Sequence, residues 1–154
     1  MNGSESCSRK FLLHKKMNTR IQSIHARRIW DSRGRPTVEV DVTLQDGTVG
    51  RGIAPAGAST GSHEAVELRD GGSAQAGYGV SRAVANVKNE IAPVLVGQDA
   101  VQQSMIDELL IELDGTVNKS RLGGNALIAT SMAVLQAAAN ADRKSTRLNS
   151  SHDQ

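Results

Sequence analysis

The chain contains very few aromatic residues and a single cysteine. Its 154 residues include one Trp, one Tyr, one Phe and one Cys. One cysteine excludes an internal disulfide and is typical of a reducing compartment, so we expect a cytoplasmic protein. The core has to be built from Val, Ile, Leu and Ala, and a chain of this length is long enough to bury one.

Long apolar runs are also lacking. No stretch approaches the length that a membrane-spanning helix needs. Phe11-Leu12-Leu13 has basic neighbours but is too short to be the apolar part of a signal peptide. The sequence therefore predicts no membrane partner.

Basic charge is concentrated at the two ends of the chain. The formal net charge is +2, but residues 1–20 and 143–154 are basic whereas residues 21–142 are acidic overall. Nucleic-acid-binding domains carry positive charge on a folded face, and single-strand binders use stacking aromatics. We therefore expect no nucleic-acid partner.

Composition divides the chain into three regions. Residues 1–20 are polar and basic without a sustained period, which predicts a disordered extension, and Met17 is an alternative start. Residues 21–142 form one folded domain. Residues 143–154 have Leu148 as their only apolar residue, so we expect a disordered tail rather than a continued buried helix.

Strand patterns come first in the folded domain. Residues 38–43 alternate apolar and polar side chains with a period of two. Residues 21–30 also have strand character, and residues 48–54 are a third strand after the Asp46-Gly47 turn signal. Short connections predict an antiparallel meander with one face in water.

Helical patterns follow the strands. Residues 63–70 are a short helix candidate. Residues 80–91 place apolar side chains on one helical face, with Ser81 as a plausible cap and Pro93 near the end.

Two further helices complete the domain. One starts at Asp99, with Gln102 completing a capping box, and ends at Gly115. The last starts near Asn125, and residues 126–139 are apolar enough to be buried on most sides. Strands followed by a helical bundle predict an α+β fold. The apolar stripe of the first of these two helices is Met105, Leu109 and Leu113.

A Gly-rich segment at Gly57–Gly61 is the main candidate for function. Two glycines flank a Ser-Thr pair, so the backbone can swing while hydroxyls and carbonyls face outward. A mobile lid of this kind can offer hard oxygen ligands to a cation such as magnesium. A plain surface turn is the alternative. A nucleotide P-loop is excluded because no Lys follows the second glycine.

Other motifs carry less chemistry. His63-Glu64 is followed by Glu67, but the second His of H-E-x-x-H is missing, and carboxylates early in a helix are favoured by its dipole. Ser59, His63 and Glu64 match a catalytic triad only by residue type, which adjacency does not support. Residues 123–125 precede a helix that could bind an anion, although close packing is the favoured interpretation.

Charged residues gather around the Gly-Pro turn that joins the first two strands. Asp31, Arg33 and Glu39 form this group. Local salt bridges at the surface are one interpretation and contribute little. A subunit contact is the other, because Arg with carboxylates suits interfaces.

Three runs, taken together in this order, resemble the N-terminal domain of enolase (phosphopyruvate hydratase). They are D-S-R-G-x-P-T-V-E-V at 31–40, G-A-S-T-G-x-H-E-A-x-E-x-R-D-G at 57–71 and L-G-G-N-A at 122–126. The similarity spans about residues 21–142. It implies a capping domain of a cytosolic, homodimeric, magnesium-dependent lyase that interconverts 2-phosphoglycerate and phosphoenolpyruvate in glycolysis.

The resemblance also assigns roles to individual residues. Ser59 corresponds to a ligand of the second, substrate-dependent magnesium ion, through its hydroxyl and main-chain oxygen. Candidate subunit contacts are Arg27, Arg33 and Glu39. The loop that would close over the phosphorylated substrate includes Gly57, Ala58, Ser59, Thr60, Gly61 and His63.

The family's catalytic residues belong to a C-terminal barrel that this sequence lacks. A (β/α)₈ barrel alone takes about 250 residues. We therefore expect no catalytic residue in this chain and no activity from it alone. Departures from the family pattern are Ala56, Gly124 and a shortened stretch after Gly71. The alternative function is a non-catalytic interaction module that binds intact enolase subunits.

Overall fold

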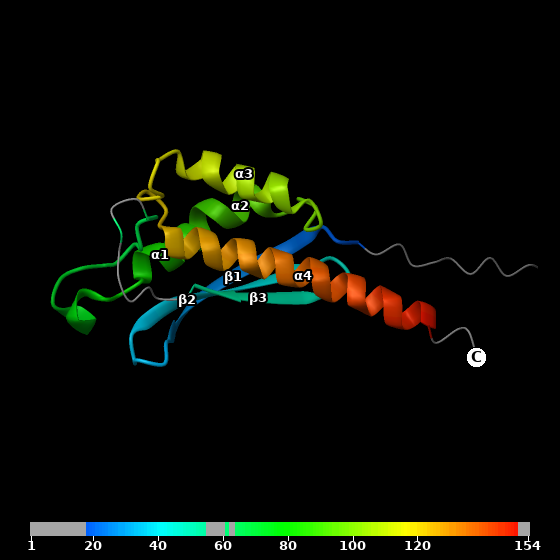
Figure 1. Cartoon of the computed structure of the whole chain (residues 1–154), viewed down its shortest axis with the longest axis horizontal. Helices are drawn as coiled ribbons and strands as arrows, with labels where there is room; N and C mark the ends of the chain where they lie inside the picture. Colours follow the sequence, from blue (N-terminus) through cyan, green and yellow to red (C-terminus); the bar gives the residue numbers. More distant parts are fainter. Residues whose placement is uncertain (1–17, 55–60, 62–63, 151–154) are drawn as a thin grey trace, which may run out of the picture.

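The computed structural model describes residues 18–54, 61 and 64–150, with side chains up to Lys144. A three-stranded sheet comes first in the chain, and helices follow it and cover one face (Figure 1). The predicted α+β class and antiparallel meander are therefore confirmed. The sheet has the order β1-β2-β3, with strands β1 (Ile21–Trp30), β2 (Pro36–Leu44) and β3 (Val49–Ile53).

Alternation along β2 separates the two faces of the sheet. Val38, Val40 and Val42 are completely buried beneath the helices. The residues between them, including Glu39 and Asp41, lie on the opposite face, where they pair with strand neighbours. This is the half-solvated sheet that the period of two predicts.

The helices lie on the buried face of the sheet. Residues 81–95 form one continuous helical stretch, in which the wide turn η2 ends two residues before Pro93. Since Pro93 has no N–H to donate, a wider turn at this position lets the helix continue to Leu95, past its expected end. The elements are η1 (Ala74–Gly77), α1 (Ser81–Asn86), η2 (Val87–Ile91), α2 (Ala92–Leu95), α3 (Gln103–Asp114) and α4 (Gly124–Ser150).

The start of α3 differs from the prediction. The helix begins at Gln103, and Asp99 instead forms a turn, accepting a 2.6 Å hydrogen bond from the Thr19 hydroxyl. Its buried face is also displaced, because Met105 is exposed whereas Ile106 and Leu110 are buried.

Two further details of the helices can be compared with the sequence. Gly115 ends α3 in the left-handed conformation, as predicted. The predicted helix over residues 63–70 is wrong for its described part, since residues 64–70 have no helical turn. Their backbone groups bond to other segments instead.

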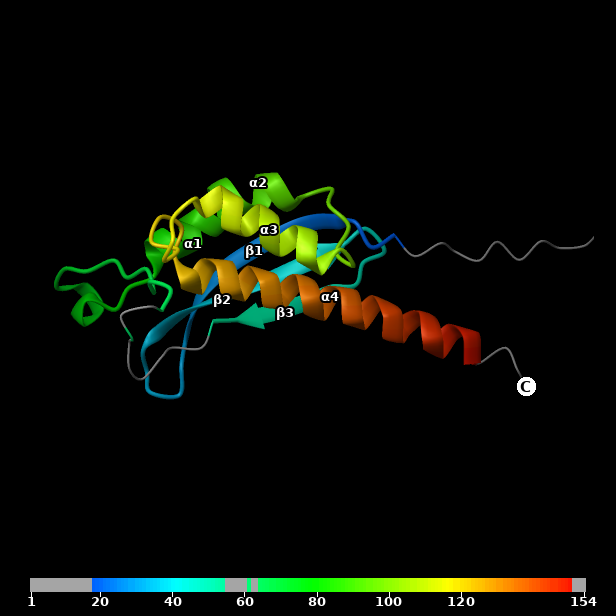
Figure 2. The ribbon, with the colours of Figure 1, turned by 45° about the horizontal axis from the view of Figure 1, so that its top comes forward.

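Helix α4 lies against β3 at very short range (Figure 2). A Cβ atom on Gly50 would overlap the backbone nitrogen of Ala137, and one on Gly52 would overlap the carbonyl oxygen of Ala129. The two glycines of β3 therefore allow helix and strand backbones to touch directly.

The ends of the domain extend further than the sequence predicts. Helix α4 continues through residues 143–150, where we expect a disordered tail, and it passes through Arg143 and Lys144, which favour helices. Residues 18–20 also pack on the domain, since the Arg20 side chain donates a 2.9 Å hydrogen bond to the Gly97 carbonyl. Residues 1–17 and 151–154 lie outside the described part.

The core between sheet and helices is aliphatic, as the composition requires. Ile21, Leu44, Ile91, Leu95 and Leu122 are all completely buried there. Among the described residues, no helix is both long enough and apolar enough to cross a membrane.

We predict that Gly50→Ala destabilises the domain by about 3 kcal/mol, because the new methyl group overlaps the α4 backbone and cannot be relieved by a rotamer change. Urea unfolding followed by circular dichroism measures this. Gly71→Ala is the control. Gly71 has φ +72° and open space around it, so this change costs only about 1 kcal/mol of backbone strain. Equal losses for both variants would contradict the close contact.

Candidate functional site

The predicted lid loop connects β3 to the segment that follows it. Most of its assigned residues lie outside the described part of the chain, including Ser59. Gly61 is described, is exposed, and accepts a 3.2 Å hydrogen bond from the Glu64 amide. What the structure does define is how the two ends of this loop are held.

The loop starts from a fixed position at Ala54, which is buried. The Ala54 amide donates to the Val38 carbonyl at 3.0 Å, and the Thr37 hydroxyl donates to the Ala54 carbonyl at 2.6 Å. Both backbone groups of Ala54 are therefore satisfied by β2, which extends the sheet by one residue beyond β3.

The loop ends against the beginning of α4. The Val66 amide donates to the Asn118 carbonyl at 2.7 Å, and the Gly124 amide donates to the Val66 carbonyl at 2.8 Å. These bonds hold the chain in an extended form, which is why the predicted helix does not form here.

Buried Asn125 completes this attachment. Its side-chain oxygen accepts from the Leu68 amide at 3.2 Å, and its side-chain nitrogen donates to the Leu68 carbonyl at 3.1 Å. One amide side chain thus satisfies both backbone groups of Leu68, as a neighbouring strand would.

The glycines before Asn125 give room for this contact. Gly123 has φ +99°, and a Cβ there would lie 2.5 Å from Leu68 Cβ, whereas one on Gly124 would lie 2.9 Å from Ala65 Cβ. The structure thus supports the packing interpretation of residues 123–125.

Arg69 and Asp70 fix the next two positions. The Arg69 guanidinium donates to the carbonyls of Pro36, at 2.6 Å, and Tyr78, at 2.7 Å, and pairs with Glu67. The Asp70 carboxylate accepts from the amides of Ser81 and Arg82 at 2.8 and 2.9 Å. Ser81, the predicted cap, makes no capping bond itself, so this prediction is wrong and Asp70 caps the helix from a distance.

Capping also changes the acidity of Asp70. Partial burial acts to raise the pKa of this carboxyl, but the bonds from Arg82 and Ser81 favour its charged form and hold the pKa below the usual range. The resulting stabilisation is present at neutral pH and is lost as the pH falls through this lowered pKa.

The exposed face of the sheet carries a charged network. Arg27 pairs with Glu39 and, at 2.7 Å, with Asp41, while Arg51 lies 2.7 Å from Asp41. Hydrogen bonds from Arg51 and Arg27 lower the pKa of Asp41 despite its partial burial. Arg33 is not part of this network and lies in the turn between β1 and β2, where its amide bonds to Asp31. The structure thus brings together only two of the three candidate subunit contacts.

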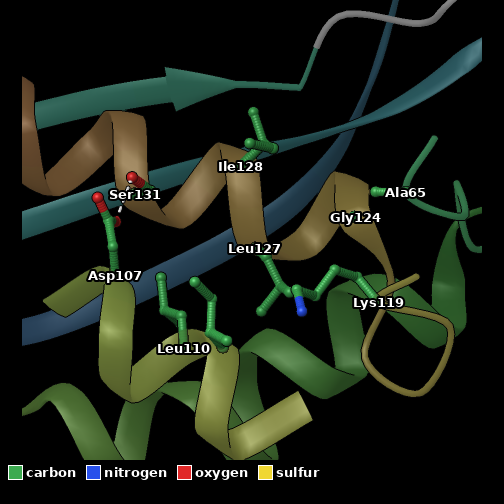
Figure 3. Close-up of a pocket in the computed structure, with 9 residues that line it drawn as sticks. Ala65, Asp107, Leu110, Lys119, Gly124, Leu127, Ile128 and Ser131 are labelled. Carbon is green, nitrogen blue, oxygen red and sulfur yellow. Dashed lines mark hydrogen bonds between the residues drawn. The ribbon is translucent and has the colours of Figure 1, made fainter. Parts of the chain in front are cut away.

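A separate pocket of about 310 Å³ lies between α3 and α4 (Figure 3). It holds none of the predicted site residues. Its one marked polar contact is the hydrogen bond from Ser131 to Asp107, at 2.7 Å. The apolar part of its lining includes Leu110, Ile111, Leu127 and Ile128.

A family model for the enolase N-terminal domain matches residues 21–147. The chain belongs to the enolase family. It is 61% identical over 127 residues to enolase 2 of Lactococcus lactis subsp. lactis (strain IL1403), covering 82% of this chain and 30% of that protein.

Two other enolases have similar sequence identity to this chain. Identity is 60% over 127 residues with the enolase of Streptococcus thermophilus, covering 82% of this chain and 30% of the relative. It is 60% over 126 residues with enolase 2 of Pseudomonas syringae pv. syringae (strain B728a), covering 81% and 30%. The chain thus spans about a third of the length of these enolases.

Sequence reasoning missed the residues that hold the loop. The sequence places Asn125 at a helix start and in a packing motif, and Arg69 and Asp70 in the family run, but it predicts none of their contacts with the loop ends. Their partners lie far away in sequence, so no local pattern reports them. A polar Asn directly before a long apolar helix was the one available signal.

We predict that Asn125→Ala costs about 2 kcal/mol, since it leaves the amide and carbonyl of Leu68 buried without partners. Urea unfolding and amide hydrogen exchange at Leu68 measure the effect. Asn140→Ala is the control, because it removes only two exposed hydrogen bonds, one to the Val49 carbonyl and one from Gln136, and costs less than about 1 kcal/mol. Unchanged exchange at Leu68 in Asn125→Ala would refute the role of Asn125.

Proposed function

We propose that this chain is the N-terminal domain of a magnesium-dependent enolase that interconverts 2-phosphoglycerate and phosphoenolpyruvate in glycolysis. The match of the enolase N-terminal domain model to residues 21–147 carries the proposal. Identity near 60% to three enolases supports it. The reaction is a carbon–oxygen lyase reaction, and we expect it in the cytoplasm.

The role of this domain is to supply the loop with Ser59. We propose that the Ser59 hydroxyl and main-chain oxygen bind Mg²⁺ and that residues from Gly57 to His63 close over the substrate. Bound Mg²⁺ would offset the negative charge of the substrate. The fixed positions of Ala54 and Leu68 support this role, because a loop held at both ends can move without losing its register.

The metal site is incomplete in this chain. Among the described residues, no group of three His, Cys, Asp or Glu side chains could hold a metal ion. A single serine does not bind Mg²⁺ tightly, since the ion prefers six oxygen ligands with octahedral geometry. The remaining ligands, and the groups that move protons, would come from the rest of a longer protein.

Subunit contact is part of the same proposal. We infer a homodimer in the longer protein, with Arg27, Arg33 and Glu39 as contact residues. The position of Arg27 supports this, since its side chain is partly exposed on the open face of the sheet and pairs there with the buried carboxylate of Glu39.

A second candidate is a non-catalytic module that binds intact enolase subunits. Exposed apolar residues of α3 and α4, two of which line the pocket between these helices, favour it, because a partner would remove them from water. They are Ile111, Ile128, Met132 and Leu135. Co-purification of the tagged chain with purified full-length enolase would support this alternative.

We predict that the purified chain forms no phosphoenolpyruvate from 2-phosphoglycerate in the presence of Mg²⁺. Ultraviolet absorbance of the product measures this, with a full-length enolase as the positive control. Metal-dependent turnover by the pure chain would contradict the prediction, since the described residues offer no metal cluster.

A longer version that includes the barrel tests Ser59 directly. We expect Ser59→Ala to lower the affinity for the second magnesium ion by about tenfold or more and to leave the affinity for the first nearly unchanged. Titration calorimetry of Mg²⁺ binding, with and without substrate, separates the two ions. Thr60→Ala is the neighbouring control. Equal weakening of both ions by Ser59→Ala would count against the assignment.

A further inference from the structure

The two aromatic side chains of the described residues lie at the same end of the domain and are both exposed. Trp30 is 57% exposed at the end of β1, and Tyr78 is 40% exposed in the loop before α1. This end lies opposite the C-terminal end of α4 (Figure 1). Large rings are normally buried in a small domain, so their exposure here needs an explanation.

Each ring is stacked with arginine. The Arg28 guanidinium carbon lies 5.3 Å from the centre of the Trp30 ring. Tyr78 has two such neighbours, Arg35 at 4.8 Å and Arg69 at 5.8 Å. These five residues are named the arginine–aromatic corner below.

The two stacks are linked through the backbone of Pro36 and Tyr78. Trp30 pairs with Pro36 across the β1–β2 ladder. The Arg69 guanidinium donates to the carbonyls of both Pro36 and Tyr78, at 2.6 and 2.7 Å. One side chain therefore connects the strand that follows Trp30 to the loop that carries Tyr78.

Arginines outnumber the carboxylates around the corner, so it carries a net positive charge. Among the described residues, no carboxylate forms an ion pair with Arg28, Arg35 or the nearby Arg33 and Arg82, and only Arg69 is paired. The nearby Asp31 and Asp70 carboxylates bond to backbone amides, and their charges partly offset those of Arg33, Arg35 and Arg82. Asp31 accepts bonds from the amides of the turn, and Asp70 caps α1.

We propose that the arginine–aromatic corner binds single-stranded nucleic acid. Arginines bind phosphates, and exposed rings provide stacking surfaces for bases, so this combination fits a strand that carries both. An acidic peptide would use the charge but leave the rings without a partner. The proposal is independent of the enolase role.

This proposal revises the expectation of no nucleic-acid partner. That expectation came from basic residues at the chain ends and from scarce aromatics. The fold instead gathers arginines from β1, the β1–β2 turn and the loop before α1 onto one folded surface, and it places Trp30 and Tyr78 there.

Trp30 provides the measurement, because it is the only Trp in the chain. We expect a single-stranded thymidine 12-mer to quench its fluorescence in a saturable way, through base stacking. If three arginines contact phosphates, affinity should fall by about 20-fold between about 50 and 200 mM salt. Absence of saturable quenching at low salt would overturn the proposal.

Variants locate the site. Arg28→Gln with Arg35→Gln should weaken binding by at least about fivefold and reduce the salt dependence. Among the described residues, neither side chain donates a hydrogen bond to the backbone, so the fold should persist, as circular dichroism would verify. Tyr78→Ala should weaken binding by about fivefold or more without changing the salt dependence. Arg143→Gln with Lys144→Gln removes equal charge on distant α4 and should have little effect.

Two other results would overturn the proposal. A polyglutamate peptide that binds as tightly as the oligonucleotide would show a surface for acidic proteins. Oligonucleotide binding that survives the corner variants, but is lost when residues 1–17 are removed, would place it on the basic extension.

Discussion

The structure depends on the direct contact between the backbone of α4 and that of β3. Gly50 and Gly52 have no side chains, so the helix rests on the strand near Ala129, Ala133 and Ala137. Small residues on both sides leave little apolar area per contact, but the resulting packing is tight. The position of α4 relative to the sheet is therefore set by backbone shape, which ordinary side-chain variation cannot adjust.

This contact also determines where the candidate site lies. Because α4 is fixed on the sheet, its first turn is fixed too, and Asn125 holds Leu68 from there. The other end of the loop is held by β2 through Thr37. The loop therefore spans two elements whose relative position is already determined, and this is the property that a closing segment needs in order to return to one closed position.

The sequence predicts those parts of the fold that depend on local patterns. The strands follow from alternation, and Gly115 and Asn125 mark helix boundaries that the structure confirms. The sequence-based predictions are wrong where hydrogen-bonding partners far away in the sequence determine the local structure. Residues 64–70 stay extended because α4 and the loop before it supply their hydrogen bonds, and Asp70 replaces Ser81 as a cap. The family runs predict a role for Ser59, which lies outside the described residues, so this role stays a prediction.

The charged network on the exposed sheet face has a consequence for assembly. Arg27, Glu39, Asp41 and Arg51 already neutralise one another within a single chain. A second subunit that approached this face would have to replace bonds that exist in the monomer, so the number of ion pairs need not increase. Such an interface would gain specificity from matched geometry but little affinity from additional ion pairs.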